Sequence, residues 1–302
     1  MTRIDIVIPC AGRVPDLLRL LQSLHQSCAA SLVQHCASIT VTDDRHTAAL
    51  AKQVHQAHPA VNYVAGPARG PAVNRNHGAR QGSAEWILFL DDDCYLEADL
   101  LAAYLQQLAA TPQADVLEGA IHAVGPRPNG NHHAPLNTTG GQLWSCNVLV
   151  RRSVFEAVGG FDEDFPFACM EDCDLLERFK AHGAAIVFAA QAVVFHPWRS
   201  ISEREVTRQI ISHAIYAHKH PAFARGFGAL HLLRALRGRM RLYASGRPSS
   251  IPLSKYRTVG YDLAAPVAVY AVMCLAPLRQ ALWRRFRNTP PQLQPQPPPE
   301  SA

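Results

Sequence analysis

Residues 3–27 read RIDIVIPCAGRVPDLLRLLQSLHQS, and this stretch sets the fold class. It begins with a β-branched run that ends at Pro9, which is typical of a short buried strand. From Pro15 to Ser27 the leucines follow helical spacing, and the proline stands in the first turn, so this segment predicts a helix. A strand followed directly by a helix is the repeating unit of α/β folds.

The same unit is repeated along the chain. Further strand and helix pairs are predicted at 38–42 and 47–58, at 61–64 and 73–82, and at 86–90 and 99–110. Beyond them we predict strands at 115–122, 143–150, 185–190 and 192–195, helices at 153–158 and 171–182, and a loop at 124–141. This alternation indicates an α/β fold with a mostly parallel sheet flanked by helices.

Charge divides the chain into two parts. Apolar residues make up 48% and charged residues 18% of the 302, which excludes disorder over most of the length. Residues 1–200 have a net charge of −6, whereas residues 201–302 have a net charge of +11. We therefore expect an α/β domain over 1–200 and a basic helical region over 201–287. The six prolines of residues 288–302 predict a disordered tail.

The basic region has two interpretations. The segment 226–243 combines an apolar side with arginines, which fits either contact with an anionic membrane or packing against the α/β domain. The uncharged stretch 263–278 is too short to span a hydrocarbon core of about 30 Å. No apolar leader precedes the first strand and the eight cysteines are scattered, so we expect a cytoplasmic protein, with a peripheral place at the inner face of the cell membrane for the basic region. Few aromatic residues stand among the arginines, which argues against nucleic acid.

Carboxylates gather where the predicted strands end. Asp43 and Asp44 follow the second strand, and Asp91, Asp92 and Asp93 follow the fourth. Ligands of open α/β sheets bind at this edge, and clustered carboxylates repel one another unless a cation neutralises them. Their oxygen atoms suit Mg²⁺ or Mn²⁺. An extended backbone would place Asp91 and Asp93 together on one side and Asp92 on the other. The alternative is an acidic turn that caps the next helix.

The remaining candidates have weaker patterns. Asp43 and Asp44 suit a base or ribose hydroxyl of a nucleotide, although one of them could cap the helix that starts at residue 47. Arg75 is a candidate partner for these acids or for phosphate groups.

A second acidic group starts the helix predicted at 171–182. Asp172 shares a face with Leu175 and Phe179, so we expect it to point inward, where it could act as a general base; helix capping is the alternative. Its neighbour Glu171 is the other catalytic candidate. His196 ends the last strand and is either a core histidine or a metal ligand.

Six segments of this chain together resemble the family 2 glycosyltransferases, which have the GT-A fold. They are IDIVIPCAGR (4–13), VTDDRHT (41–47), GPAVNRNHGARQGSAEWILFLDDD (70–93), LWSCNVLVRRSVFEAVGGFDEDF (143–165), EDCDLLERFKAHG (171–183) and AVVFHP (192–197). The resemblance implies a GT-A catalytic domain over residues 1–200. It departs from the family where Arg45 and His46 replace a small or hydroxyl residue.

The resemblance also implies an inverting sugar transfer from a nucleotide diphosphate sugar to an acceptor hydroxyl. Asp91 and Asp93 match the metal-binding DxD pair, Asp172 the catalytic base, and His196 a histidine that some relatives place near the metal. The residues that match nucleotide contacts are Pro9, Asp43 or Asp44, and Arg75. Asp91 and Asp92 are further candidates for binding the donor.

The expected role is bacterial cell-surface glycan or glycolipid synthesis, with a glycan or lipid-linked acceptor. A nucleotidyltransferase is one alternative, although CAGR (10–13) is a poor version of its glycine-rich basic loop. A non-catalytic protein that binds sugar nucleotides is another alternative.

Overall fold

The computed structural model describes residues 2–130, 132–226, 228–245 and 256–287. The tail predicted at 288–302 lies outside the described residues. Among them, the central element is a seven-stranded sheet with the order β3-β2-β1-β4-β7-β5-β8. Its strands are β1 (Ile4–Cys10), β2 (Cys36–Asp43), β3 (Asn62–Ala65), β4 (Trp86–Leu90), β5 (Val116–Ala123), β7 (Asn147–Arg151) and β8 (Ile186–His196). Only β7 runs antiparallel to its neighbours, which confirms a mostly parallel sheet.

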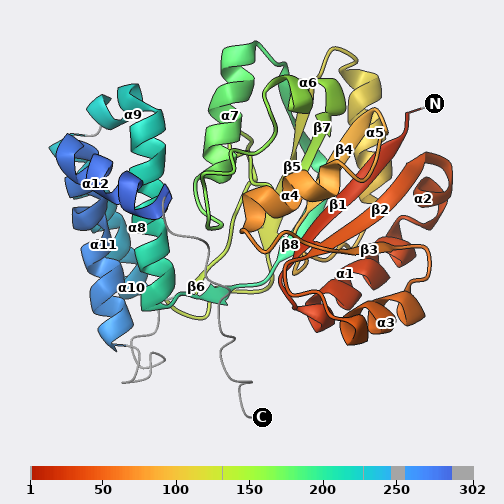
Figure 1. Cartoon of the computed structure of the whole chain (residues 1–302), viewed down its shortest axis with the longest axis horizontal. Coiled ribbons are helices and arrows are strands. Elements are labelled where there is room, and N and C mark those ends of the chain that lie inside the picture. Colours follow the sequence, from red (N-terminus) through yellow and green to blue (C-terminus); the bar gives the residue numbers. More distant parts are fainter. Residues whose placement is uncertain (1, 131, 227, 246–255, 288–302) are drawn as a thin grey trace.

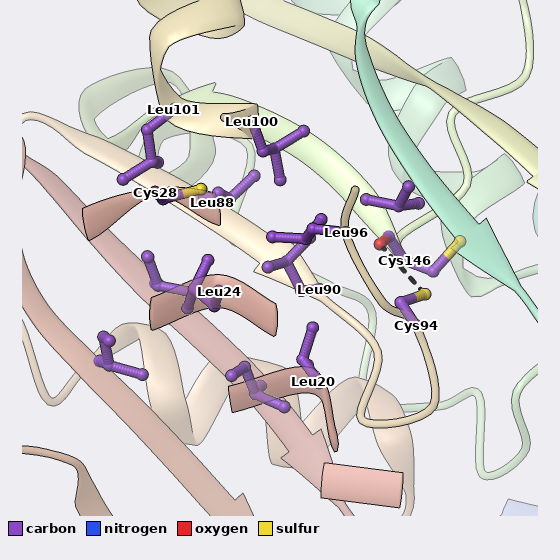
Figure 2. Packing of buried hydrophobic residues seen from close by; sticks show 14 of the residues in the cluster. Leu20, Leu24, Cys28, Leu88, Leu90, Cys94, Leu96, Leu100, Leu101 and Cys146 are labelled. Carbon is purple, nitrogen blue, oxygen red and sulfur yellow. Dashed lines mark hydrogen bonds between the residues drawn. The ribbon is translucent and has the colours of Figure 1, made fainter. Parts of the chain in front are cut away.

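Helices cover both faces of the sheet (Figure 1). They are α1 (Val14–Ser27), α2 (Ala29–His35), α3 (Ala48–Ala57), α4 (Pro71–Ala79), α5 (Leu100–Ala110), α6 (Arg152–Ala157) and α7 (Glu171–His182). Side chains alternate along a strand, so each strand feeds two cores. In β1, Ile6 and Ile8 pack with the leucines of α1, whereas Val7 packs with Phe155 of α6 and Phe179 of α7. Figure 2 shows part of the first core.

The structure differs from the predicted elements in three places. The helix α2 was not predicted, and the segment predicted as a strand from residue 143 becomes a strand only at Asn147. The two last predicted strands, 185–190 and 192–195, form one strand, β8. Its pairing with β5 shifts by three residues between Ala189 and Val193. Asn147 of β7 reaches into this irregular part and donates to the carbonyl of Ala192 at 2.8 Å. A contact between residues so far apart in sequence leaves no local pattern.

The C-terminal part is helical, as predicted, and lies beside the sheet (left in Figure 1). Its helices are α8 (Glu203–Lys219), α9 (Pro221–Gly226), α10 (Ala229–Ser245), α11 (Tyr256–Cys274) and α12 (Ala276–Arg287). Two short strands, β6 (His132–His133) and β9 (Arg199–Ser200), pair with each other at its base. Ile211 and Ile215 of α8 pack against Phe165, which lies in the loop before α7. This contact anchors α8 to the sheet domain.

The apolar side of α10 is not covered by the described part of the chain. Leu230 is 57%, Leu233 61% and Met240 59% exposed. Packing of this side against the α/β domain, one of the two interpretations from the sequence, is therefore not what the described residues show. None of the described helices is both long enough and apolar enough to cross a membrane.

Candidate active site

The strands that carry the predicted acids end at one edge of the sheet. β1 and β2 stay in parallel register up to the pair Cys10 and Asp43, and β4 runs beside β1. A cavity of about 890 Å³ opens there. Four residues predicted from the sequence line it, namely Pro9, Asp44, Arg75 and Asp91. The other predicted residues are buried and do not line it: Asp43, Asp92, Asp93, Glu171, Asp172 and His196.

The three consecutive aspartates do not alternate as an extended strand would. The amide of Cys94 donates to the carbonyl of Asp91 at 3.2 Å, which closes a turn. As a result, Asp92 and Asp93 both bind the guanidinium of Arg13, whereas Asp91 binds Arg75 at 2.7 Å. Asp92 and Asp93 thus share one arginine and Asp91 binds another, and the pairing of Asp91 with Asp93 at one ion stays a prediction.

Asp92 is fully buried and is held by Arg13. Burial raises its pKa to about 7, with Asp93 adding to the effect, although the charge of Arg13 acts in the opposite direction. This carboxylate faces an arginine instead of the cavity. The nucleotide contact predicted for Asp92 consequently has no support from its position.

Asp93 and His196 lie together at the end of β8. Oδ1 of Asp93 is 3.3 Å from Nε2 of His196, and Arg199 donates to Oδ2 of Asp93 at 2.8 Å. Burial alone would raise the pKa of Asp93, but His196, Arg13 and Arg199 together lower it well below its usual range. Burial alone would lower the pKa of His196, but Asp93 raises it. Asp93 is therefore a permanent anion at neutral pH.

The chemistry of this pair fits a divalent metal ion. The ring atom Nδ1 of His196 donates to the carbonyl of Pro197 at 2.8 Å, which leaves Nε2 directed at Asp93 as a possible ligand. Oδ1 of Asp93 is buried and accepts no hydrogen bond from the part of the chain that the structure describes. Cys94 offers a third ligand atom within 4.8 Å, but its contact with Cys146 and its burial raise the pKa of the thiol far above neutrality. Asp91 is not part of this group, so its role as a metal ligand stays a prediction.

Arg75 links the two predicted acidic groups. This buried side chain of α4 donates to Asp91 at 2.7 Å and to Glu171 at 3.0 Å. Burial and the charge of Asp172 raise the pKa of Glu171 to about 8, although Arg75 acts in the opposite direction. The carboxyl group of Glu171 is therefore engaged by Arg75 within the protein.

Asp172 has a different environment from Glu171. It points inward as predicted and is 6% exposed, and Oδ1 accepts the amide of Cys173 at 2.9 Å. None of the ion pairs among the described residues includes Asp172. Burial raises its pKa, and Arg75 offsets only part of this effect. Met170, the residue before α7, has a left-handed backbone with φ of 71°, a conformation that costs about 1–3 kcal/mol and sets the direction of this first turn.

The two aspartates at the end of β2, Asp43 and Asp44, have different hydrogen-bond partners. Asp43 accepts the amides of Gly12 and Arg45 and the hydroxyl of Tyr63, so it organises the loop after β1 and does not cap a helix. Thr47 itself caps α3. Asp44 accepts the amides of Ala68 and Gly70, which fixes the loop before α4, and its side chain faces the cavity. Of the pair, Asp44 is placed to meet a ligand.

Sequence reasoning identified Arg75 but missed Arg13 and Arg199, the other two arginines that cover the acids. Arg13, Arg75 and Arg199 all line the cavity and each binds an aspartate of the 91–93 turn. Arg13 follows β1 and Arg199 follows His196 by three residues, so position after a strand end is the signal that could have identified both. The wall of the cavity thus carries arginines beside Asp44 and Asp91, and Asp92 and Asp93 are buried behind it.

Comparison with known proteins assigns this architecture. The sequence profile of glycosyl transferase family 2 matches residues 5–155, half of the chain, and the protein belongs to this family. Its α/β fold is that of the GT-A glycosyltransferases, as expected. The nucleotidyltransferase alternative is thereby set aside.

Two curated relatives indicate the setting in which such chains occur. One is the O-antigen biosynthesis protein RfbC of Myxococcus xanthus, 30% identical over 64% of this chain, but the match spans only 17% of that protein. Another is the N-acetylglucosaminyl-diphospho-decaprenol L-rhamnosyltransferase of Mycobacterium tuberculosis, 26% identical over 66% of this chain and 77% of its own length.

Two solved structures share the fold across most of the chain. The mannosyltransferase PcManGT from Pyrobaculum calidifontis, solved with GDP-Man and Mn²⁺, has a TM-score of 0.51 at 15% identity, covering 94% of this chain and 79% of that one. TarS 1-349 of S. aureus has a TM-score of 0.51 at 20% identity, covering 93% and 92% respectively. At these identities the likeness extends to the fold alone.

Proposed function

We propose that this protein transfers a sugar, with inversion, from a nucleotide diphosphate sugar to an acceptor hydroxyl during bacterial cell-surface glycan or glycolipid synthesis. The observation that carries this proposal is Asp172, a buried carboxylate without an ion-pair partner among the described residues, on the first turn of α7. A base in this position can take the proton of the acceptor hydroxyl while that oxygen attacks the anomeric carbon. The bond to the diphosphate breaks on the opposite face, and the diphosphate leaves with the electron pair.

The chain's own cations prepare the site for a negatively charged donor. Arg13, Arg75 and Arg199 line the cavity, and Asp44 faces it from the loop before α4. We assign Asp44 to a base or ribose hydroxyl, because carboxylates repel phosphate groups. Pro9 lies at the end of β1, where it contributes an apolar surface to the same cavity.

Mg²⁺ or Mn²⁺ is the cofactor that we propose. Asp93 and His196 would hold it, with Asp91 as a further candidate. A bound ion supplies Lewis-acid stabilisation of the charge that develops on a leaving diphosphate. The Mn²⁺ and GDP-Man in the archaeal mannosyltransferase support both the metal and the donor class.

A direct test measures release of the nucleoside diphosphate. Wild-type protein is incubated with UDP-, GDP- and dTDP-sugars and Mn²⁺, with and without an acceptor extract, and the products are identified by mass spectrometry. Asp172→Asn should abolish transfer while nucleotide binding stays within a few-fold. Glu177→Gln, on the exposed side of the same helix, is the matched control and should retain activity. Nucleotide binding without turnover in the wild type would instead indicate a non-catalytic binding protein.

We further propose that the protein works at the inner, cytoplasmic face of the cell membrane. The exposed Leu230, Leu233 and Met240 of α10 stand beside Arg234 and Arg237, a combination that suits an anionic surface. In a flotation assay the protein should rise with vesicles containing phosphatidylglycerol but not with purely zwitterionic vesicles. Failure to rise with either vesicle would rule out this location.

A further inference from the structure

The cavity extends well beyond the strand ends where a donor is expected. Its far wall is formed by α8, through Arg204, Thr207 and Arg208, and by the loop that precedes α7, through Pro166 and Phe167. This wall differs from the donor edge, because its acids Glu163 and Asp164 pair with cations other than the arginines of α8. It is a second compartment of the same cavity.

Arg204 and Arg208 stand one helical turn apart and both face the cavity. No ion pair within the described ranges includes either of them, whereas Arg13, Arg75 and Arg199 each hold a carboxylate. The neighbouring Glu205 acts on Arg208 through its charge, but its carboxylate forms no ion pair with either arginine in the part of the chain that the structure describes; it accepts the amide of Ser202 at 2.6 Å in the cap of α8 instead. The pair is therefore short of negative charge.

Placing two like charges at this spacing costs stability. Like-charged pairs four residues apart on a helix repel each other and destabilise it. Burial lowers the pKa of Arg208, and the charge of Arg204 adds to this effect. The guanidinium of Arg208 also lies over the ring of Phe167, 5.3 Å from its centroid, which fixes it in the wall. An anion bound between the two arginines would offset these costs.

The position of the pair relates it to the acceptor side of the reaction. The loop that carries Phe167 leads directly into α7, where Asp172 is the base in the proposed function. Phe165 in the same loop packs against Ile211 and Ile215 of α8. An acceptor whose hydroxyl reaches Asp172 would pass along this loop, whereas the donor diphosphate is expected at the 91–93 turn.

We propose that Arg204 and Arg208 form a subsite for a phosphate ester group of the acceptor, such as the phosphate that joins a sugar to a lipid carrier. This inference rests on the proposed function for the direction of approach, but the binding of the phosphate group does not depend on turnover. The subsite would select acceptors that carry an anion close to the reacting hydroxyl.

The test is a calorimetric titration with farnesyl phosphate, and with farnesol as the uncharged probe of equal chain length. UDP or GDP with Mn²⁺, whichever raises the melting temperature, is present at saturation so that the donor edge is filled. Farnesyl phosphate should bind and farnesol should bind at least ten-fold more weakly. Arg204→Gln and Arg208→Gln should each weaken the binding of farnesyl phosphate roughly ten-fold. This loss of affinity is expected for one charge-assisted hydrogen bond.

Matched controls separate binding at this subsite from a general attraction between a basic protein and an anion. Arg225→Gln removes an exposed charge from α9, outside the cavity, and should change the affinity for neither ligand. Nucleoside diphosphate affinity should stay within two-fold in the α8 variants, and inorganic phosphate should compete with the probe. The proposal is overturned if the wild type does not bind farnesyl phosphate or if farnesol binds equally well. It is also overturned if Arg225→Gln has the same effect as the α8 variants, or if the α8 variants lose nucleotide affinity instead. Absence of sugar transfer in a protein that shows the expected binding would refute the proposed function alone.

Discussion

Replacing Arg75 by Gln should destabilise the protein strongly, and more so at high pH. The substitution removes hydrogen bonds of 2.7 Å to Asp91 and 3.0 Å to Glu171. Asp91 is 25% exposed and can regain water, but Glu171 is 2% exposed and cannot. Breaking a buried ion pair by removing one partner typically costs about 3–5 kcal/mol. We expect about 3 kcal/mol at pH 8, or a fall in melting temperature of roughly 6–12 °C at about 2–4 °C per kcal/mol.

The pH dependence follows from the carboxyl group that loses its partner. The pKa of Glu171 is already raised to about 8, and loss of Arg75 raises it further. A carboxyl group with a raised pKa in the folded state binds more protons than in the unfolded state, so stability falls as pH rises above the unfolded value of about 4.3. The variant should therefore lose less stability relative to wild type at pH 6, where Glu171 is protonated, than at pH 8.

Thermal unfolding followed by circular dichroism at pH 6 and pH 8 measures both effects. Arg80→Gln is the control, because Arg80 is 64% exposed and its pair with Glu163 should contribute at most about 1 kcal/mol. The double variant Arg75→Gln with Glu171→Gln should recover at least half of the loss, since no uncompensated charge remains there. A fall below 2 °C at pH 8, or a larger fall at pH 6, would refute the reasoning.

Three further expectations concern the fold, the base and the cation site. Gly119→Ala should lower the melting temperature by several degrees, because a Cβ atom there would lie 2.0 Å from Nδ2 of Asn147; unchanged melting would contradict the packing. In a plot of transfer rate against pH, the midpoint of the rise on the acid side should lie above the usual aspartate pKa of about 3.9, because burial raises the pKa of Asp172. A midpoint at or below that value would exclude Asp172 as the base. Arg199→Gln should bind Mn²⁺ more tightly than wild type in an electron paramagnetic resonance titration, because a competing cation leaves Asp93; weaker binding would show that Arg199 assists the ion.

The fold was predictable because its determinants are local. The β-branched run of β1 and the leucines of α1 each settle one element within a few residues, and their repetition settles the sheet. The irregular part of β8 was not predictable, since it depends on Asn147, which bridges to Ala192 across 45 residues of sequence. The short helix α2 directly follows α1 and shows too few apolar residues at helical spacing to be distinguished from its surroundings.

The residue types of the candidate site were predictable from the sequence, but the ion pairs between these residues were not. Positions after strand ends identified the acids correctly as a group, and the helical face of Asp172 gave its inward direction. Their ion pairs join residues 16 to 106 positions apart, from Arg75 with Asp91 to Arg199 with Asp93, and no spacing rule connects such pairs. The sequence therefore indicated where negative charge collects, but not that arginines already neutralise most of it.

This neutralisation bears on how a metal ion could be accommodated. Arg13 holds the fully buried Asp92, so its departure would leave an unpaired charge in the protein interior, at a cost of several kcal/mol. Arg199 is 43% exposed and also contacts Asp16 near the surface, so it can leave Asp93 and remain both solvated and paired. The two arginines are therefore not equivalent, although both bind the same carboxylate. An ion that binds Asp93 and His196 would displace Arg199 first, and the freed guanidinium would stay at the wall of the cavity, where it adds positive charge beside an incoming diphosphate.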